Sequence, residues 1–243
     1  MVRNIVSLLV GVAILAAGCA DPELEKRVAD LETKVTEIEK RGPAGAVVPT
    51  ANPEEEQAAA NLLKEVGEAM DKMDYDTARA KVTELKTKYA STRAAKAVVR
   101  TEEELAIIGK PEAALTVEKW FQGSESDVKG GEATLYVFWE VWCPHCKREV
   151  PKLAETYNKY KGQGLNMVGL TKMSRDVTDD QVTAFLSEQK ITYPIAKEQG
   201  DSMSQAYGVK GIPAAAVVKD GKVVWRGHPA KLNDDMIKGW LGT

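Results

Sequence analysis

The sequence predicts an α/β fold with a mixed sheet in its C-terminal half, preceded by helical segments. From residue 111 to the end, short apolar runs typical of strands alternate with helical stretches. The last two of these runs are separated by Asp220-Gly221, a dipeptide that favours a tight hairpin turn. Residues 54–110, in contrast, are rich in Ala, Glu, Lys and Leu, with no proline between Pro53 and Pro111. This part is therefore expected to be helical throughout.

Length and composition limit the classes of function. The chain has 243 residues, 44% of them hydrophobic, which is room for one large domain or a domain with extensions. Its net charge of −3 is small and no long basic run occurs, which argues against nucleic acid as a partner. It has three cysteines and two histidines, and a closed Cys/His metal site would need nearly all of them. We therefore expect no metal site.

The first 18 residues are expected to be a signal peptide. One positive charge, Arg3, precedes an apolar run at 5–17. That run is too short to span a bilayer, which takes about 20 helical residues. It ends in Ala16-Ala17-Gly18-Cys19, which resembles the lipobox of bacterial lipoproteins, although Ala16 stands where Leu is preferred. The alternatives are an ordinary cleaved signal and a plain membrane anchor.

The resemblance to the lipobox implies a location. Cys19 would be lipidated and would become the new N-terminus, so the protein would be lipid-anchored to a membrane of the bacterial cell envelope. The rest of the chain would then lie in the periplasm or outside the cytoplasm, an oxidising compartment.

Residues 19–41 comprise the lipidated cysteine and a predicted short coiled coil. The apolar positions repeat in a 4-3-4-3 pattern, formed by Leu24, Val28, Leu31, Val35 and Ile38. With the leucines and the isoleucine at d, every e position is acidic and every g position is basic. A parallel pair sets g against e, and an antiparallel pair sets like charges together. Residues 22–41 therefore predict a parallel homo-oligomer. The alternative is a single solvated helix.

Residues 42–53 are predicted to form a flexible linker, because glycine and proline recur through them. Three helices are then expected within 54–110, at about 54–73, 76–90 and 92–108. The stretch 74–95 resembles the second helix of a tetratricopeptide repeat and the turn after it. Fewer repeats are present than the three normally needed for a stable array. A helical spacer that packs on the next domain is therefore an equal alternative to a peptide-binding groove.

Residues 111–243 are expected to form one α/β domain. The predicted strands lie near 114–118, 133–139, 165–171, 214–219 and 222–226. The predicted helices lie near 143–161, 178–190, 200–207 and 231–241.

The motif Cys143-Pro144-His145-Cys146 stands where a predicted strand leads into a helix. Residues three apart on a helix are neighbours, so the two sulfurs can form a redox-active disulfide. The first cysteine lies at the helix N-terminus, where unpaired amides and the helix dipole stabilise a thiolate. Pro144 suits the first helical turn, which needs no amide donor. We therefore expect Cys143 to be the accessible nucleophile and Cys146 to be the shielded, resolving thiol.

Three other uses of this motif were considered. Covalent haem attachment needs a histidine after the second cysteine, and residue 147 is Lys. A zinc knuckle needs a second pair of ligands, and the chain offers only His145 and the distant His228. A purely structural disulfide remains an alternative.

The surrounding residues resemble the thioredoxin family. Phe138-Trp139, Trp142-Cys143, Cys146 and Pro151 match its active-site strand and helix. Further along, Gly208 to Pro213 match its cis-proline loop, followed by a hairpin. The resemblance implies a thioredoxin-like fold, in which Pro213 lies against the disulfide. It also implies that the backbone of Ile212 pairs with a bound substrate strand, and that Trp142 and Pro213 help to shape the docking surface.

Within that superfamily, residues 112–243 most resemble the TlpA/ResA-like branch. Glu149 matches the acidic residue of its C-x-x-C-x-x-E-x-P pattern, and the stretch 178–196 matches its extra helix and strand. The buried aspartate of thioredoxin is replaced by Val137, so Glu149 is the candidate proton acceptor, with an ion pair to a neighbouring lysine as the alternative. Peroxidase chemistry would need Thr or Ser at position 140, which is Glu. A peroxiredoxin is therefore not expected.

The predicted function is that of a thiol–disulfide oxidoreductase acting on protein thiols and disulfides, with a redox partner protein and no cofactor. The dipeptide Pro144-His145 is that of the strong oxidant DsbA, whereas the TlpA/ResA-like branch leans towards reduction. A histidine that stabilises the Cys143 thiolate would make the pair more oxidising. The alternative function is a membrane-tethered interaction protein, in which the helical segment and the thioredoxin fold dock a partner.

Overall fold

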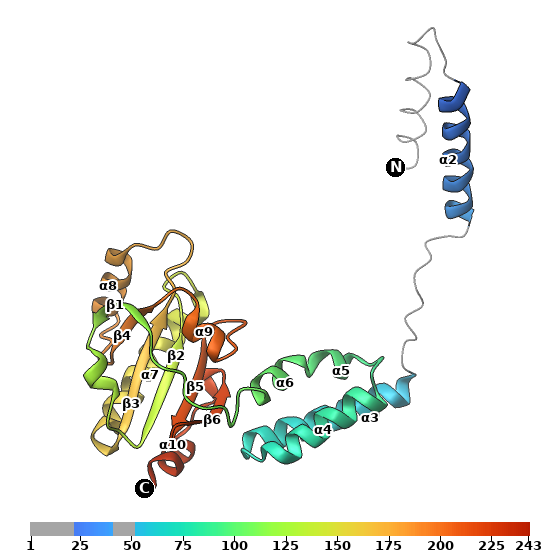
Figure 1. The fold of residues 1–243 in the computed structure, drawn as a ribbon. Helices are drawn as coiled ribbons and strands as arrows, with labels where there is room; N and C mark the ends of the chain where they lie inside the picture. The colour runs from blue at the N-terminus through green and yellow to red at the C-terminus, as the bar shows by residue number, and fades with distance from the viewer. Residues whose placement is uncertain (1–21, 41–51) are drawn as a thin grey trace. The chain divides into compact units, whose positions relative to one another are not determined.

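The computed structural model describes residues 22–40 and 52–243 (Figure 1). The chain divides into two units, residues 1–50 and 51–243. The predicted signal peptide, Cys19 and most of the predicted linker lie outside the described residues. Within the described ranges, no helix is both long and apolar enough to cross a membrane.

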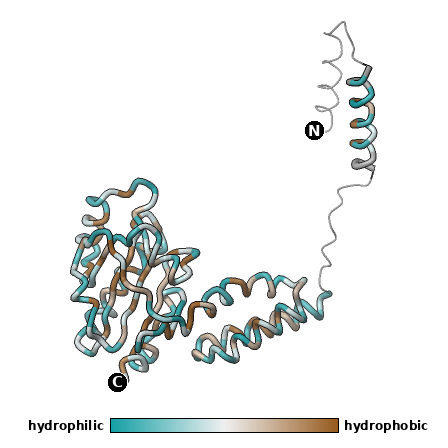
Figure 2. Tube along the Cα trace, viewed as in Figure 1, coloured by the Kyte–Doolittle hydropathy of each residue, from teal (hydrophilic) through white to brown (hydrophobic). Residues whose placement is uncertain are grey.

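Helix α2 (Pro22–Lys40) is the described part of the first unit. Hydrophobic residues are interspersed among hydrophilic ones along it (Figure 2). Leu31 and Val35 are 60% and 52% exposed. Lys34 and Asp30 form an ion pair at 2.7 Å along the helix surface. The helix was predicted, and two of its apolar heptad positions are uncovered in the single chain.

The second unit begins with four helices, α3 (Pro53–Asp71), α4 (Tyr75–Lys88), α5 (Arg93–Ala97) and α6 (Val99–Leu105). Two details differ from the predicted arrangement. The linker ends earlier than predicted, because Asn52 caps α3 by accepting a hydrogen bond from the Glu55 amide and Pro53 starts the helix. The expected helix at 92–108 is divided at the fully buried Val98.

These helices share a hydrophobic core of their own. In the second of them, α4, one face is buried and consists of Ala78, Val82 and Leu85. They pack with residues of the other helices, namely Ala59, Leu62, Val66, Ala69, Ala94, Ala95, Val98 and Leu105. The segment therefore has an interior that does not depend on the sheet.

The rest of the unit is a six-stranded mixed sheet in the order β1-β4-β3-β2-β5-β6. The strands are β1 (Val117–Gln122), β2 (Ala133–Phe138), β3 (Leu165–Thr171), β4 (Ile195–Glu198), β5 (Ala214–Lys219) and β6 (Lys222–Gly227). β2, β3 and β4 are parallel to one another, and β1, β5 and β6 run antiparallel to their neighbours. The predicted thioredoxin-like fold is confirmed. The first strand begins three residues later than the expected 114–118.

Helices cover both faces of this sheet (Figure 1). They are α7 (Pro144–Tyr160), α8 (Asp179–Glu188), α9 (Ser202–Ala206) and α10 (Asp234–Leu241), with short 3₁₀ turns at 125–128, 161–163 and 229–231. Side chains of α7, α8 and α10 belong to the core on one face, and those of α9 to the core on the other. Central strands covered on both faces become nearly continuous apolar runs, which explains the sequences of β2 and β3.

The chain between α6 and β1 runs along the edge of β6. The amide of Gly109 donates to the Val223 carbonyl at 2.8 Å, and the Val223 amide donates to the Lys110 carbonyl at 2.9 Å. From α4, the Tyr75 hydroxyl donates to the Val224 carbonyl at 3.0 Å, and burial raises the pKa of Tyr75 to about 12. The edge strand is therefore covered, and the helical segment packs on the sheet.

Candidate active site

Cys143 is the N-cap residue of α7, directly after the loop that follows β2. Its amide donates to the Glu140 carbonyl at 3.1 Å. Its Sγ accepts a hydrogen bond from the Cys146 amide at 3.3 Å. Pro144 occupies the first turn, as predicted. The sulfur of Cys143 thus takes the place of a capping oxygen at a helix N-terminus, where a thiolate is favoured.

Both thiols are free, and both are buried. Cys143 is 4% exposed and Cys146 is 0% exposed. Cys143, which was expected to be the accessible thiol, is covered by the loop before β5. Burial raises the pKa of the Cys146 thiol, and the neighbouring Cys143 and the charge of Glu140 act in the same direction. Cys146 is the better shielded thiol.

The loop that covers Cys143 ends at a cis peptide bond between Ile212 and Pro213, as the sequence resemblance implied. The Ile212 carbonyl oxygen lies 3.8 Å from Cys143 Sγ. Ile212 is half-buried, and it packs against the cores on both faces of the sheet. The structure therefore brings the two predicted motifs together, although they are far apart in the sequence.

Trp142 lies under a loop that follows β3. Its indole Nε1 donates to Ser174 Oγ at 3.0 Å, and the guanidinium of Arg175 lies 3.5 Å from the centre of its ring. Three residues of this loop adopt left-handed backbone conformations, Met173, Arg175 and Asp176, with φ of 57°, 63° and 56°. Such conformations are strained for residues other than glycine. The loop is therefore held in place by its contacts beside the reactive cysteine.

Glu140 makes contacts that the sequence did not reveal. It is 4% exposed, and its carboxylate accepts hydrogen bonds from Thr171 Oγ1 at 3.1 Å, the Ser174 amide at 3.3 Å and Ser174 Oγ at 3.2 Å. The one sign of a buried, partnered carboxylate in the sequence is the position of Glu140 between Trp139 and Val141 in an apolar run. Its partners lie about 30 residues further along the chain, at the end of β3 and in the loop that follows. Glu140 anchors the loop that lies on Trp142.

Glu149 lies further along α7, where it forms an ion pair with Lys152 at 3.1 Å. This is the alternative weighed for Glu149 from the sequence. Cys146 is affected by the charge of Glu140, and Glu149 is not among the groups that shift its pKa. A role for Glu149 as proton acceptor stays a prediction.

His145 is exposed on the first turn of α7. Its Nδ1 lies 2.6 Å from Nη2 of Arg148. A guanidinium can only donate, so Arg148 is the donor in this contact. Lys147 and Arg148 both place positive charge on the first turns of α7.

A pocket of about 280 Å³ opens between these loops. Its wall is formed by Trp142 and Ser174 on one side and by residues 209–212 on the other, with Glu140 among the lining residues. Among the described residues, no group of three or more His, Cys, Asp or Glu side chains could hold a metal ion. The site offers a buried pair of thiols beside an open groove, which suits chemistry at sulfur on an extended substrate.

Comparison with known proteins gives consistent matches. A family model described as the AhpC/TSA family matches residues 110–226. The thiol-disulfide oxidoreductase ResA of Bacillus thuringiensis subsp. konkukian (strain 97-27) is 34% identical over 127 residues, which are 51% of this chain and 71% of that protein. The sporulation thiol-disulfide oxidoreductase A of Bacillus subtilis (strain 168) is 21% identical over 128 residues, 52% of this chain and 78% of that protein. The crystal structure of StoA from Bacillus subtilis is 21% identical with a TM-score of 0.45, covering 54% of this chain and 98% of that one.

Proposed function

This chain belongs to the ResA-like thiol-disulfide oxidoreductases of the thioredoxin superfamily, and we propose that it exchanges disulfides with proteins of the bacterial cell envelope through Cys143 and Cys146. One observation carries the proposal. The Cys143 sulfur caps the helix that also bears the buried Cys146, and it lies 3.8 Å from the Ile212 carbonyl oxygen. A nucleophile, a resolving thiol and a backbone edge for a substrate strand therefore lie together.

The reaction takes two exchanges. The Cys143 thiolate attacks one sulfur of a substrate disulfide, that S–S bond breaks, and the leaving sulfur takes up a proton. Cys146 then loses its proton and attacks Cys143 Sγ, which releases the second substrate thiol and leaves the Cys143–Cys146 disulfide. The substrate gains two electrons and two protons, and the dithiol loses them. With an oxidised enzyme and a dithiol substrate, the same steps run in reverse.

The environment of Cys146 suits the second position. Burial raises the pKa of its thiol, so Cys146 stays protonated while Cys143 reacts. The N–H group of Cys146 points to Cys143 Sγ and supports the first nucleophile instead. Trp142 and the Ile212–Pro213 bond flank the groove and would contact the substrate.

The location is part of the proposal. Lipid on Cys19 would anchor the chain to a membrane, with the oxidoreductase domain in the periplasm or outside the cytoplasm. The sequence from Arg3 to Cys19 supports this, since it has the pattern of a lipoprotein signal. The exposed Leu31 and Val35 of α2 support parallel self-association next to the membrane.

Reduction of insulin or of an oxidised peptide by the full-length protein tests the activity. We expect turnover with dithiothreitol as electron source, none for Cys143→Ser, and accumulation of a mixed disulfide with Cys146→Ser. Cys19→Ser is the matched control, since it should leave turnover unchanged and abolish membrane association and lipid labelling. A folded protein with an intact cysteine pair and no turnover would contradict the proposal and favour the interaction protein.

A further inference from the structure

Arg226 is a buried cation in β6 with an unusual set of partners. The residue is 5% exposed, and burial lowers the pKa of its guanidinium. Within residues 22–40 and 52–243, no carboxylate lies within ion-pair distance of it. A charge taken out of water needs partners for its donors. Here backbone carbonyl groups supply them.

Four carbonyl oxygens accept from the guanidinium. Nε donates to Tyr207 at 2.9 Å, and Nη2 donates to Gly208 at 3.4 Å. Nη1 donates to Ala215 at 3.3 Å and to Gly227 at 3.2 Å. The first two acceptors end α9, where helix carbonyls lack partners within the helix. A guanidinium has five N–H donors spread over three nitrogens in a rigid fork, so it reaches four acceptors in different directions, whereas a lysine ammonium has three donors on a single nitrogen.

These acceptors bracket the loop that covers Cys143. Tyr207 and Gly208 lead into the loop, and Ala215 follows Pro213 at the start of β5. One side chain therefore holds both ends of the segment that presents the Ile212 carbonyl to the Cys143 sulfur. The ring of Tyr207 also stacks on that of Tyr136, with ring centres 5.1 Å apart, which helps to fix the start of the loop.

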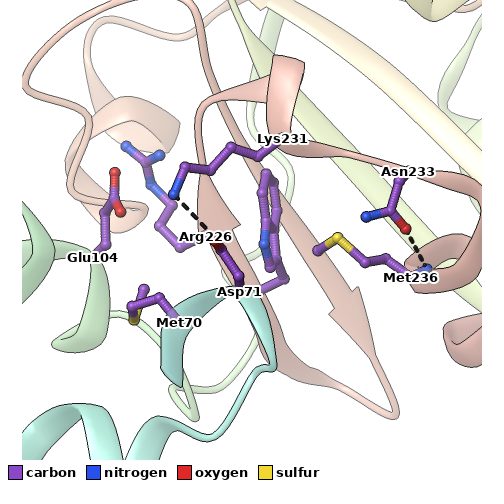
Figure 3. Close-up of a pocket in the computed structure, with 8 residues that line it drawn as sticks. Met70, Asp71, Glu104, Arg226, Lys231, Asn233 and Met236 are labelled. Atoms are coloured by element: carbon purple, nitrogen blue, oxygen red, sulfur yellow. Dashed lines mark hydrogen bonds and ion pairs between the residues drawn. The ribbon is translucent and has the colours of Figure 1, made fainter. Parts of the chain in front are cut away.

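Residues of the helical segment lie close to Arg226 as well. Glu104 of α6 and Arg226 both line a pocket of about 370 Å³ between the helices and the sheet (Figure 3). Burial lowers the pKa of Arg226, the charge of Glu104 acts in the opposite direction, and the charge of Arg100 adds to the lowering. Glu104 is itself held by Arg100 at 3.3 Å, with a side chain that is 16% exposed. Across the pocket, Lys231 pairs instead with Asp71 of α3 at 3.4 Å (Figure 3).

We infer that Arg226 is a positioning residue, which fixes the Ile212–Pro213 loop for backbone pairing with polypeptide substrates, and that Glu104 makes the helical segment part of this support. The inference rests on the proposed function, because it concerns the loop of the same site. Only substrates that lie along the loop depend on it. A small disulfide needs only the thiols of Cys143 and Cys146 and makes no backbone pairing with the loop.

The test compares two substrates with one preparation of the full-length protein. We expect Arg226→Lys to lower kcat/KM for an oxidised peptide by about tenfold or more and that for hydroxyethyl disulfide by less than about twofold. The ratio of the two values does not depend on the folded fraction, so a merely structural role would leave it unchanged. Lys231→Gln is the matched control and should keep the wild-type ratio.

Equal losses with both substrates, or no loss with the peptide, would overturn the inference. Should Arg226→Lys fail to fold, Glu104→Gln takes its place, and we expect it to lower the same ratio by about two- to threefold. An unchanged ratio in Glu104→Gln would overturn the role of the helical segment. If the wild-type protein reduces neither substrate, the proposed function fails, and the outcome is distinct from a change in the ratio.

Discussion

Replacing Glu140 by alanine should destabilise the protein, because it removes the acceptor that holds the loop after β3. Thr171 is fully buried, so its hydroxyl loses its carboxylate acceptor without access to water. An unsatisfied buried donor costs about 1–3 kcal/mol. The Ser174 amide and hydroxyl belong to an exposed residue and can turn to water, so each adds about 0.5–1 kcal/mol at most.

Relief from desolvation of the carboxylate offsets part of this loss. A net decrease of about 2 kcal/mol in the free energy of unfolding follows, or about 4–8 °C in Tm for a unit of this size. Glu140→Gln keeps one acceptor oxygen for Ser174 and should lose about 1 kcal/mol or less. The assay is reversible thermal or urea unfolding of both variants, with Glu155→Ala on the exposed face of α7 as the control.

A local measurement accompanies the global one. The Ser174 amide donates to Glu140 and should exchange its hydrogen faster in Glu140→Ala, whereas amides within β5 should not change apart from the global shift. An alanine variant as stable as wild type, or a glutamine variant as damaged as the alanine variant, would refute the reasoning. A stable alanine variant would mean that the cost of desolvating the carboxylate outweighs its hydrogen bonds. A glutamine variant as unstable as the alanine variant would mean that the negative charge of Glu140, and not its acceptor geometry, stabilises the loop.

Three further predictions concern the thiols and α2. Iodoacetamide near neutral pH should label Cys143 before Cys146, because burial raises the pKa of Cys146; mass spectrometry showing the reverse order would overturn the assignment. His145→Ala should lower the reduction potential of the pair in a glutathione titration, and an unchanged potential would count against a role for the imidazole. Val28→Cys should crosslink between copies in membranes, since parallel a positions face each other; membranes that yield monomer alone would exclude the parallel coiled coil.

The position of the reactive pair was predictable because its signals are local. Pro144 at a first helical turn and Cys143 as its cap act over a few residues, and the structure has both as expected. The hairpin at Asp220-Gly221 is equally local, since positive φ values at both residues, 50° and 69°, suit a tight turn. The mixed α/β fold followed from the alternation of apolar runs and helical stretches.

Other features of the site depend on contacts between distant segments. β1 starts at Val117 because its register follows its antiparallel partner β4, and no residue in 114–118 fixes that register. The burial of Cys143 depends on the loop at Ile212, which the sheet order brings over it. Cys143 was expected to be the accessible thiol of the pair, and a helix N-terminus by itself does not show which distant segment covers it.

The sequence by itself determined the position of the cysteine pair at a helix N-terminus, the helix that bears it and the class of fold, because capping, turn formation and hydrophobic periodicity act between near neighbours. The tertiary structure alone decided that Glu140 holds the loop on Trp142 and that Arg226 binds both ends of the loop over Cys143. Both are charged side chains within or next to apolar strands. What a buried charge does in the fold depends on the groups that bind it. Most of those partners are backbone and hydroxyl groups of segments distant in the sequence, and no local pattern shows which of these groups will meet the charge.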